Sequence, residues 1–396
     1  MLAAQIAAQI AALWDSPRLR AWAGQALLLL LFIGTLVWLA GNTVENLAVR
    51  SIRVGFDFLA RPANFPISES VIPYSPTDSF AWAYVVGIGN TLMISALAIL
   101  SATLLGLFVG LARRSAHPML SGMAGVFVTA VRNTPLIVQL LFWYALATTS
   151  LPAPRNALHP LPGVYLSQRG LYLPGIEWSG NGWTFAAGTA AVLVIAAALA
   201  RQLRNQGRHN RQGRMVRALP VAGAVAVAVA AMLLLAWATG VGAKASLPEL
   251  RGFNFTGGMR LSPEFAALMV GLVLYTSAFI GEIIRGGIDA VGRGQWEAGR
   301  ALGLSERQTL MRIVMPQALR VIIPPLTTQY LSTVKNSTLA LAVGFPELGL
   351  VIGTVINQTG QALESIAILL GVYLTIGAAV SLLMNWCNAR TALATR

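Results

Sequence analysis

The chain has 396 residues, of which 56% are hydrophobic and only 11% are charged. A typical soluble domain carries about 25% charged residues, so this composition excludes a soluble enzyme, a disordered protein and a secreted disulfide-linked scaffold. The net charge of +14 is high enough to suggest nucleic-acid binding, but the positions of the basic residues argue against it.

Eight apolar segments are each long enough to cross a bilayer as a helix. The first is longer than the apolar core of a signal peptide, so we expect a retained helix, with a cleaved signal as the alternative. The segments are 22–41, 84–111, 119–148, 183–200, 218–241, 265–284, 321–345 and 365–386. The expected fold class is an all-α polytopic membrane protein with about eight transmembrane helices.

The lysines and arginines are distributed unequally between the two sides of these spans. With the N-terminus in the cytoplasm, 18 of them lie inside, 8 lie outside and 2 lie within spans. This bias follows the positive-inside rule and predicts that both termini are cytoplasmic. The basic segment 201–217 either fixes this orientation or binds lipid headgroups. Because topology explains the charge, we expect no nucleic-acid partner.

Two long segments on the predicted outer side, 42–83 and about 149–182, contain many Pro, Gly and aromatic residues. We expect them to be ordered but irregular, lying against the outer membrane face or an external partner. One cysteine and three scattered histidines exclude an internal disulfide and provide no Cys/His metal cluster. The chain also lacks a P-loop motif and a visible catalytic constellation, so we expect neither a cofactor nor an enzymatic site.

Two polar strings interrupt the apolar segments. The first, RNTPL, contains Arg132, Asn133 and Thr134, and the second, KNSTL, contains Lys335, Asn336, Ser337 and Thr338. Pro135 removes a backbone donor and should break the helix at the first string. Lipid disfavours such groups, so both strings should face protein or water. The first is either a structural kink or part of a solute path, and the second is either a gating element or an interhelical contact.

Glu282 and Arg285 lie three residues apart at the inner end of the sixth predicted span. On a helix they share one face and can pair. The simplest interpretation is an ion pair at the membrane interface.

The cytoplasmic segment 286–320 is patterned as two short helices rather than as a plain linker. The string QWEAGRAL predicts the first helix, Gly303 ends it, and Ser305 with Gln308 fits a capping box for the second. Pro316 then allows a helix to restart. Such a unit should either dock onto a cytoplasmic partner or rest on the membrane as an amphipathic helix.

This segment resembles the signature EAA-x3-G-x9-I-x-L-P of permease subunits of bacterial ABC importers. The matching residues are Glu297, Ala298, Gly299, Gly303, Ile313 and Pro316. Two positions depart from the signature, since Gly299 replaces an alanine and Met315 replaces a leucine. The strings RNTPLIVQLLFWYA and PQALRVIIPPLTTQYLSTVKNSTLA further resemble polar amino-acid permeases of the histidine/glutamine type, most of all the larger permease of general L-amino-acid importers.

The resemblance implies a five-helix type I ABC importer permease core in 84–148 and 265–396. Residues 1–83 would then be an N-terminal span with a long periplasmic segment. Residues 149–264 would be a periplasmic segment with an inserted helical pair. The chain is thereby expected to form the path for L-amino acids through a bacterial inner membrane.

The resemblance also assigns roles and partners. Glu297 would offer a carboxylate to a separate ATPase, and Ala298 and Gly299 would keep the helix surface small. The expected partners are an ABC ATPase dimer that binds the ATP, a periplasmic amino-acid-binding protein, the lipid bilayer and a second permease that is a different chain. The two polar strings remain candidates for lining or gating the path.

Two other classes of protein are alternatives. An ion-coupled secondary amino-acid transporter ordinarily needs carboxylates near the membrane midplane and an inverted repeat, and neither is evident. A membrane scaffold would use 286–320 to recruit a cytoplasmic protein without moving a solute. A membrane-embedded enzyme is less favoured because no catalytic set is visible.

Overall fold

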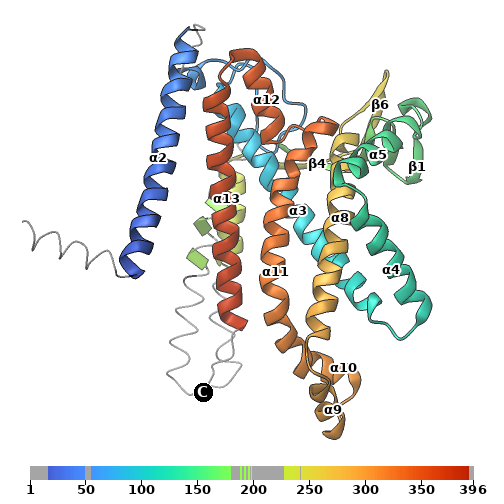
Figure 1. Cartoon of the computed structure of the whole chain (residues 1–396). Helices are drawn as coiled ribbons and strands as arrows, with labels where there is room; N and C mark the ends of the chain where they lie inside the picture. The colour runs from blue at the N-terminus through green and yellow to red at the C-terminus, as the bar shows by residue number, and fades with distance from the viewer. Residues whose placement is uncertain are drawn as a thin grey trace, which may run out of the picture. The chain divides into compact units, whose positions relative to one another are not determined.

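The computed structural model describes residues 17–49, 55–179, 227–240 and 242–391, together with isolated positions between 188 and 198. The described chain is mainly helical (Figure 1), as expected. It divides into two compact units. Residues 1–93 and 346–386 form the first unit, and residues 94–345 and 387–396 form the second.

Within the described residues, four helices are long and apolar enough to cross a membrane. They are α2 (Pro17–Val49), α3 (Phe80–Arg113), α8 (Pro263–Asp289) and α13 (Ala362–Thr391). Two further candidate spans are broken. One joins α4 (Pro118–Asn133) to α5 (Leu136–Thr149) with a bend of 103°, and the other, Glu306–Val343, joins α12 (Leu348–Thr359) with a bend of 53°.

These helices coincide with six of the eight predicted spans. The predicted span 183–200 lies largely outside the described residues. Of the span predicted at 218–241, the structure describes a shorter apolar helix, Val227–Ala238. The described residues therefore account for up to six spans, and the count of eight stays a prediction.

The break between α4 and α5 lies at Pro135, where the sequence predicts it. Thr134 and Pro135 are extended, with ψ of 125° and 137°. The buried side chain of Gln139 donates hydrogen bonds to the carbonyl oxygens of Val131 (2.9 Å) and Thr134 (3.0 Å). Because these bonds satisfy carbonyls that the break would otherwise leave free, the kink is a stabilised feature of the fold.

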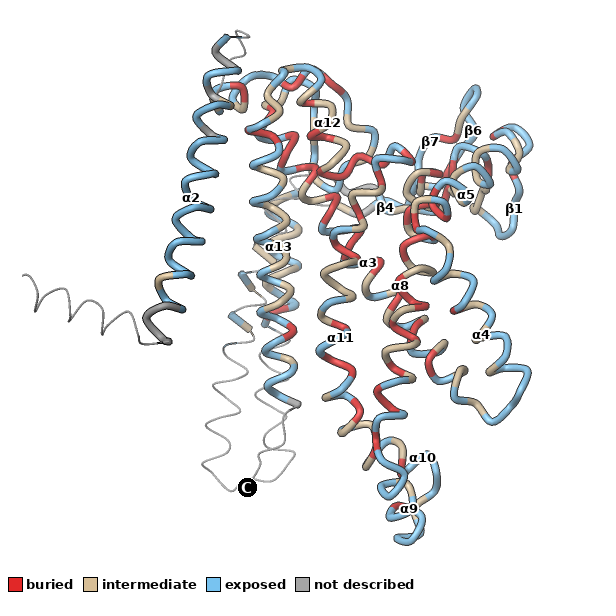
Figure 2. The backbone as a smooth tube through the Cα atoms, in the orientation of Figure 1, coloured by how far each residue is buried: buried red, intermediate tan, exposed pale blue. Residues whose placement is uncertain are grey.

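Helix α8 is central to the second unit. It packs against α4, α5, α11 (Met315–Asn336) and the 3-10 helix η4 (Ser337–Val343), and Figure 2 shows buried residues along its length. Its N-terminus is capped by Ser262, whose hydroxyl accepts a hydrogen bond from the Phe265 N–H at 3.0 Å. Pro263 occupies the first turn, where its missing N–H costs nothing.

Glycines allow α3 to cross α8 closely within the second unit. A Cβ atom at Gly106 would lie 2.6 Å from Cγ2 of Ile280, and one at Gly110 would lie 2.8 Å from the carbonyl oxygen of Gly281. A Cβ atom at Gly281 would in turn lie 2.8 Å from Cγ1 of Val109. This is the small-residue crossing typical of membrane helices, in which the two backbones approach each other.

Short strands flank the undescribed segment between α5 and α8. The strands β1 (Leu158–Leu161), β2 (Val164–Ser167), β3 (Gly170–Leu173) and β8 (Met259–Leu261) form an antiparallel sheet in the order β1-β2-β3-β8. The strand β4 (Gly175–Ser179) pairs with β5 (Gly242–Ser246), and β6 (Glu249–Arg251) pairs with β7 (Asn254–Thr256). A short 3-10 turn, η2 (Pro154–Asn156), precedes them.

The expectation of an irregular segment at 149–182 was therefore wrong for residues 158–179. Two-residue turns reverse the chain there, and one of them contains Gly163 with φ of +76°. A left-handed glycine in a two-residue turn favours a hairpin. The flanking residues are too few to show a clear alternation, which is why the sequence alone did not reveal the strands.

The segment 42–83 was predicted to be irregular, and within the first unit this holds for residues 55–79. The prediction was wrong for 42–49, which belong to α2, and for 80–83, which belong to α3. Residues 55–79 contain only the 3-10 turn η1 (Asp57–Ala60) and an isolated bridge. Phe58 and Phe65 are buried in one cluster with Tyr84 of α3 and Val351 of α12. Residues 55–79 are thereby packed against the helices of their own unit.

Candidate functional site

The loop that follows α8 forms two short helices, as the sequence predicts. They are α9 (Arg293–Ala301) and α10 (Glu306–Thr309), and the π-helical turn η3 (Leu310–Val314) leads from α10 into α11. The capping box is confirmed, since the Ser305 hydroxyl accepts from the Gln308 N–H at 3.3 Å and the Ser305 N–H donates to Gln308 Oε1 at 2.9 Å. Gly303 turns the chain with φ of +71°, a conformation that glycine adopts without strain.

Helices α9 and α10 pack together at Gly299 and Thr309. A Cβ atom at Gly299 would lie 2.5 Å from Thr309 Cγ2 and 2.6 Å from Thr309 Oγ1. Thr309 is only 1% exposed, and its hydroxyl is buried without a hydrogen-bond partner. The glycine that departs from the EAA pattern thus fits a contact inside the loop, so its small size serves the packing of α9 on α10.

The other signature residues are more accessible. Glu297 and Ala298 lie on the exposed side of α9, Gly303 and Pro316 are exposed, and Ile313 is half-buried. The loop therefore presents Glu297 and Ala298 to its surroundings while the neighbouring glycine holds the helix in place. Their predicted contact with an ATPase stays a prediction.

An open cavity of about 700 Å³ lies beside α9. Its charged lining residues are Arg114, Arg293, Arg300, Asp289, Glu297 and Glu306, and Trp296 adds an aromatic face. Three basic and three acidic groups surround one opening, so both donors and acceptors are available. A cavity lined in this way can bind the polar side chains of a protein partner better than it can bind a single small ion of either sign.

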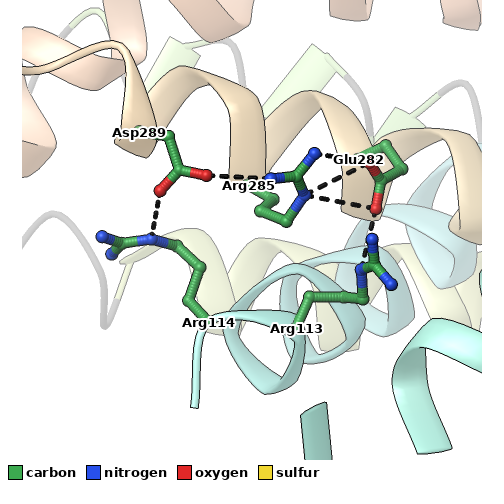
Figure 3. Close-up of polar contacts among 5 residues, drawn as sticks. All are labelled: Arg113, Arg114, Glu282, Arg285 and Asp289. Carbon is green, nitrogen blue, oxygen red and sulfur yellow. Dashed lines mark hydrogen bonds and ion pairs between the residues drawn. The ribbon is translucent and has the colours of Figure 1, made fainter. Parts of the chain in front are cut away.

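Five charged side chains join the C-terminal end of α8 to the C-terminal end of α3 (Figure 3). Glu282 pairs with Arg285 (Nη2 to Oε2, 3.0 Å) and with Arg113 (Nε to Oε1, 3.0 Å). Asp289 pairs with Arg285 (Nη1 to Oδ2, 3.0 Å) and with Arg114 (Nε to Oδ1, 2.7 Å). The predicted Glu282–Arg285 pair is confirmed, and it belongs to a larger network in which each acid holds two arginines.

Arg114 extends this network to α9. Its guanidinium carbon lies 5.4 Å from the centroid of the Trp296 ring, within the range of a cation–π interaction. Arg114 therefore connects the end of α3, Asp289 at the end of α8, and Trp296 in α9. Residues 290–292 also join α8 to α9 directly, so α9 is connected to α8 by the chain and by Arg114, and to the end of α3 by Arg114.

The first polar string lies deeper along α8. A cavity of about 360 Å³ is lined by Arg113, Val128, Thr129, Arg132, Asn133, Phe279 and Glu282. The Arg132 guanidinium carbon lies 4.8 Å from the centroid of the Phe279 ring. The structure thus brings Arg132 and Asn133 together with a carboxylate, whereas the Thr134 hydroxyl donates back to the Ala130 carbonyl at 2.9 Å.

The second polar string marks the change from α11 to the 3-10 helix η4. The hydroxyl of buried Ser337 donates to the Val334 carbonyl at 2.7 Å, and that of Thr338 donates to the Lys335 carbonyl at 2.7 Å. Lys335 is exposed and Asn336 is half-buried. Two of the four polar groups therefore serve the local backbone, and a role of this string in the solute path stays a prediction.

Sequence reasoning missed several residues of the site. Gly106 and Gly110 form a GxxxG pattern, and Asp289 follows Glu282 by seven residues on the same helix, so both signals were present in the sequence. Arg114 and Trp296 carried no such signal, because nothing in their spacing places them side by side.

A buried carboxylate also escaped notice. Glu347 is fully buried and caps α12, accepting hydrogen bonds from the Leu350 N–H (3.2 Å), the Thr91 hydroxyl (3.2 Å) and the Tyr373 hydroxyl (3.3 Å). The bond from the Leu350 N–H is that of a helix cap, and the two hydroxyls come from α3 and α13 of the same unit. Together these contacts account for the carboxylate structurally, without an ion-coupling role.

Comparison with known proteins identifies relatives along nearly the whole chain. The amino-acid ABC transporter permease protein YhdX of Escherichia coli K12 is 44% identical to it, over 96% of each chain. This chain belongs to the amino-acid ABC transporter permeases. The general L-amino acid transport system permease protein AapQ of Rhizobium johnstonii is 39% identical, over 97% of this permease and 95% of its own length.

Further matches agree with this assignment. The glutamate/glutamine/aspartate/asparagine transport system permease protein BztB of Rhodobacter capsulatus is 33% identical, over 94% of this permease and 93% of its own length. Residues 215–393 match the family described as binding-protein-dependent transport system inner membrane component. The permease is thus a subunit of an amino-acid ABC transporter, and the ion-coupled alternative is not supported.

Proposed function

We propose that this permease is one of two unlike permease subunits in an ATP-driven importer of L-amino acids. It lies in a bacterial inner membrane with both termini in the cytoplasm. A periplasmic amino-acid-binding protein delivers the solute, and a dimer of ATPase subunits binds and hydrolyses the ATP. The names of the relatives support amino acids as the solute class, and the family description supports the binding protein.

The observation that carries this proposal is the construction of α9. Glu297 and Ala298 are exposed on a short helix. That helix is held in place by the close packing of Gly299 against Thr309 and by the cation–π contact between Trp296 and Arg114. A helix held in this way moves as a rigid body. When ATP closes the two ATPases, α9 is displaced. The network of charged side chains drawn in Figure 3 then transmits the displacement to α3 and α8.

The solute path has a candidate lining in the cavity of about 360 Å³ beside α8. An amino acid is a zwitterion and needs both donors and acceptors along its path. Arg132 and Asn133 supply donors there, and Glu282 supplies acceptor oxygens. The string at 335–338 is proposed to gate the path, because its change from α-helix to 3-10 helix offers a point at which the span can bend.

Cysteine cross-linking tests the proposed contact with the ATPase. The native Cys387 is replaced by serine, and single cysteines are placed at Ala298 and at Leu161, which lies in β1 at the other end of the second unit. In native membranes, a bifunctional maleimide should join Ala298→Cys to an ATPase chain with a yield that changes on addition of ATP. Leu161→Cys should give no such product. A cross-link from Leu161→Cys, or none from Ala298→Cys at normal transport, would contradict the proposal.

The subunit composition is tested by gentle extraction of the tagged permease from its native membrane. We expect an ATPase and a second permease of different sequence to co-purify, and mass spectrometry identifies both. Recovery of this permease as identical copies with an ATPase would contradict the unlike pair. Recovery with no ATPase, with and without an ATP analogue, would contradict the importer.

A further inference from the structure

The strands and the loop that contains α9 lie at opposite ends of α8, as Figure 1 shows for β6 and α9. Strand β8 ends at Leu261, directly before the Ser262 cap of α8, and α9 begins shortly after its other end. Helix α8 has 27 residues, which at 1.5 Å per residue corresponds to roughly 40 Å. Since α9 faces the ATPase in the proposed function, the strands lie on the outer side of the membrane.

An exposed aromatic residue stands at the tip of one hairpin on this side. Strands β6 and β7 pair Arg251 with Asn254, which leaves Gly252 and Phe253 as a two-residue turn. Gly252 has φ of +66°, as such turns require. Phe253 is 72% exposed, and the guanidinium carbon of Arg155 lies 4.5 Å from its ring centroid.

Contacts with the four-stranded sheet hold the hairpin in place. Phe255 is buried, with its ring 5.0 Å from that of Tyr172 and 4.5 Å from that of Tyr165. The Tyr172 hydroxyl donates to Asn254 Oδ1 at 2.7 Å. The residues on the strand that follows the tip are therefore anchored to the four-stranded sheet. Phe253 is presented in a fixed position and loses little conformational freedom when a partner covers it.

The charge around the tip is basic. The described outer strands and their connections, 150–179 and 242–262, contain five arginine and lysine residues and two glutamates. Aromatic residues, phenylalanine among them, and arginine are enriched at protein interfaces, and a basic surface attracts an acidic one before contact. This surface fits a partner with an apolar pocket for the Phe253 ring and a carboxylate for Arg155.

We propose that Phe253 and Arg155 form a docking surface for the amino-acid-binding protein. The inference rests on the proposed function, because it takes its partner from binding-protein-dependent transport and its side of the membrane from the ATPase contact of α9. The Phe253 ring enters an apolar pocket at the rim of the binding protein, and Arg155 pairs with a carboxylate beside it. The strands are thus a recognition platform added to the membrane core.

The test uses the complete transporter in nanodiscs, where both faces are accessible. The probe is the periplasmic binding protein captured with the native complex, loaded with a mixture of L-amino acids, and the readout is ATP hydrolysis against its concentration. Phe253→Ala should raise the half-saturating concentration tenfold or more, with the basal rate and the maximal rate unchanged. Arg155→Ala should raise it several-fold and weaken its salt dependence. Met259→Ala, at an exposed apolar position on β8, is the control and should match the wild type.

The outcomes separate the inference from the function on which it rests. If the wild type responds to the binding protein and Phe253→Ala responds at the same concentrations, the docking surface is overturned and the function stands. If the wild type shows no response to the binding protein, the proposed function itself fails. If Phe253→Ala changes only the dependence of activity on anionic lipid, the tip is a membrane contact and the inference is overturned.

Discussion

At the scale of single residues, neighbouring positions of α9 differ in their exposure to solvent. Glu297 and Ala298 are exposed, whereas Gly299 is buried. A substitution at an exposed position of this helix should disturb a partner contact and leave the fold of the permease intact. A substitution at the buried position should act on the loop itself.

Glu297→Lys should leave membrane insertion unchanged and lower amino-acid uptake and ATPase recruitment at least about tenfold, corresponding to about 1.4 kcal/mol. The physical reason is that a carboxylate offered to the partner becomes a repelling cation. The measurements are uptake by intact cells and ATPase recovery on purification. Glu306→Lys reverses the charge of another exposed carboxylate in the same loop, and it should have a smaller effect. Equal losses in the two variants would show that only the total charge of the loop matters.

Arg114 gives a second prediction at this scale. Arg114→Ala should raise the ATP consumed per amino acid transported, because α9 loses its side-chain contact with the end of α3 and with Asp289. Arg114→Lys keeps a positive charge for Asp289 but stacks less well on Trp296, so its effect should be intermediate. A cation–π contact near the surface contributes about 0.5–1 kcal/mol. If Arg114→Ala and Trp296→Ala have independent, additive effects on this ratio, the proposed link is absent.

At the scale of elements, the loop depends on the fit of α9 against α10. Gly299→Ala restores the alanine of the EAA pattern, yet its methyl group would collide with Thr309. Overpacking of this kind costs about 1–3 kcal/mol, so coupling of ATP hydrolysis to uptake should fall. Adding Thr309→Ala removes both colliding atoms and a buried hydroxyl without a partner, and coupling should recover. Normal coupling in Gly299→Ala alone would show that the loop adjusts freely.

The crossing of α3 and α8 is the second feature at this scale. Gly110→Val should push the two helices apart and strain the pairs of Arg113 and Arg114 with α8, at a cost of about 1–3 kcal/mol. The expected results are a lower melting temperature of the purified permease and lower uptake. Gly122→Val introduces the same side chain on α4, where a Cβ atom meets nothing within 4 Å, and should be tolerated. A melting temperature unchanged by Gly110→Val would exclude a tight crossing.

At the scale of the whole molecule, the charge distribution and α8 make a joint prediction about sidedness. With Cys387 replaced by serine, cysteines are placed at Leu161 of β1 and at Leu302 after α9, which are 66% and 76% exposed. A membrane-impermeant maleimide should label Leu161→Cys in spheroplasts. It should label Leu302→Cys only after permeabilisation. The opposite pattern would place both termini outside.

Much of the fold follows from features that the sequence displays directly. Apolar length determines that the chain crosses a membrane, Pro135 determines the break between α4 and α5, and Ser305 with Gln308 determines the start of α10. Each of these is a local effect. The first depends on the composition of one segment, and the other two depend on a residue that acts on the backbone within a few positions. The spaced signature from Glu297 to Pro316 was sufficient to indicate the family, which the relatives then confirmed.

The contacts between distant segments were decided by the tertiary structure. Arg114 and Trp296 are 182 positions apart, and so no periodicity could place them together; Gly299 faces Thr309 rather than a partner only because α9 folds back onto α10. The strands β1–β3 pair with β8 across a long interval of sequence. Local chemistry thus determined the class of protein, the break at Pro135 and the start of α10, but not the strands. The tertiary structure decided the placement of Phe253, the ion pairs between α3 and α8, and the packing of α9 on α10. Each of these is stabilised by contacts between residues that do not neighbour one another in the sequence.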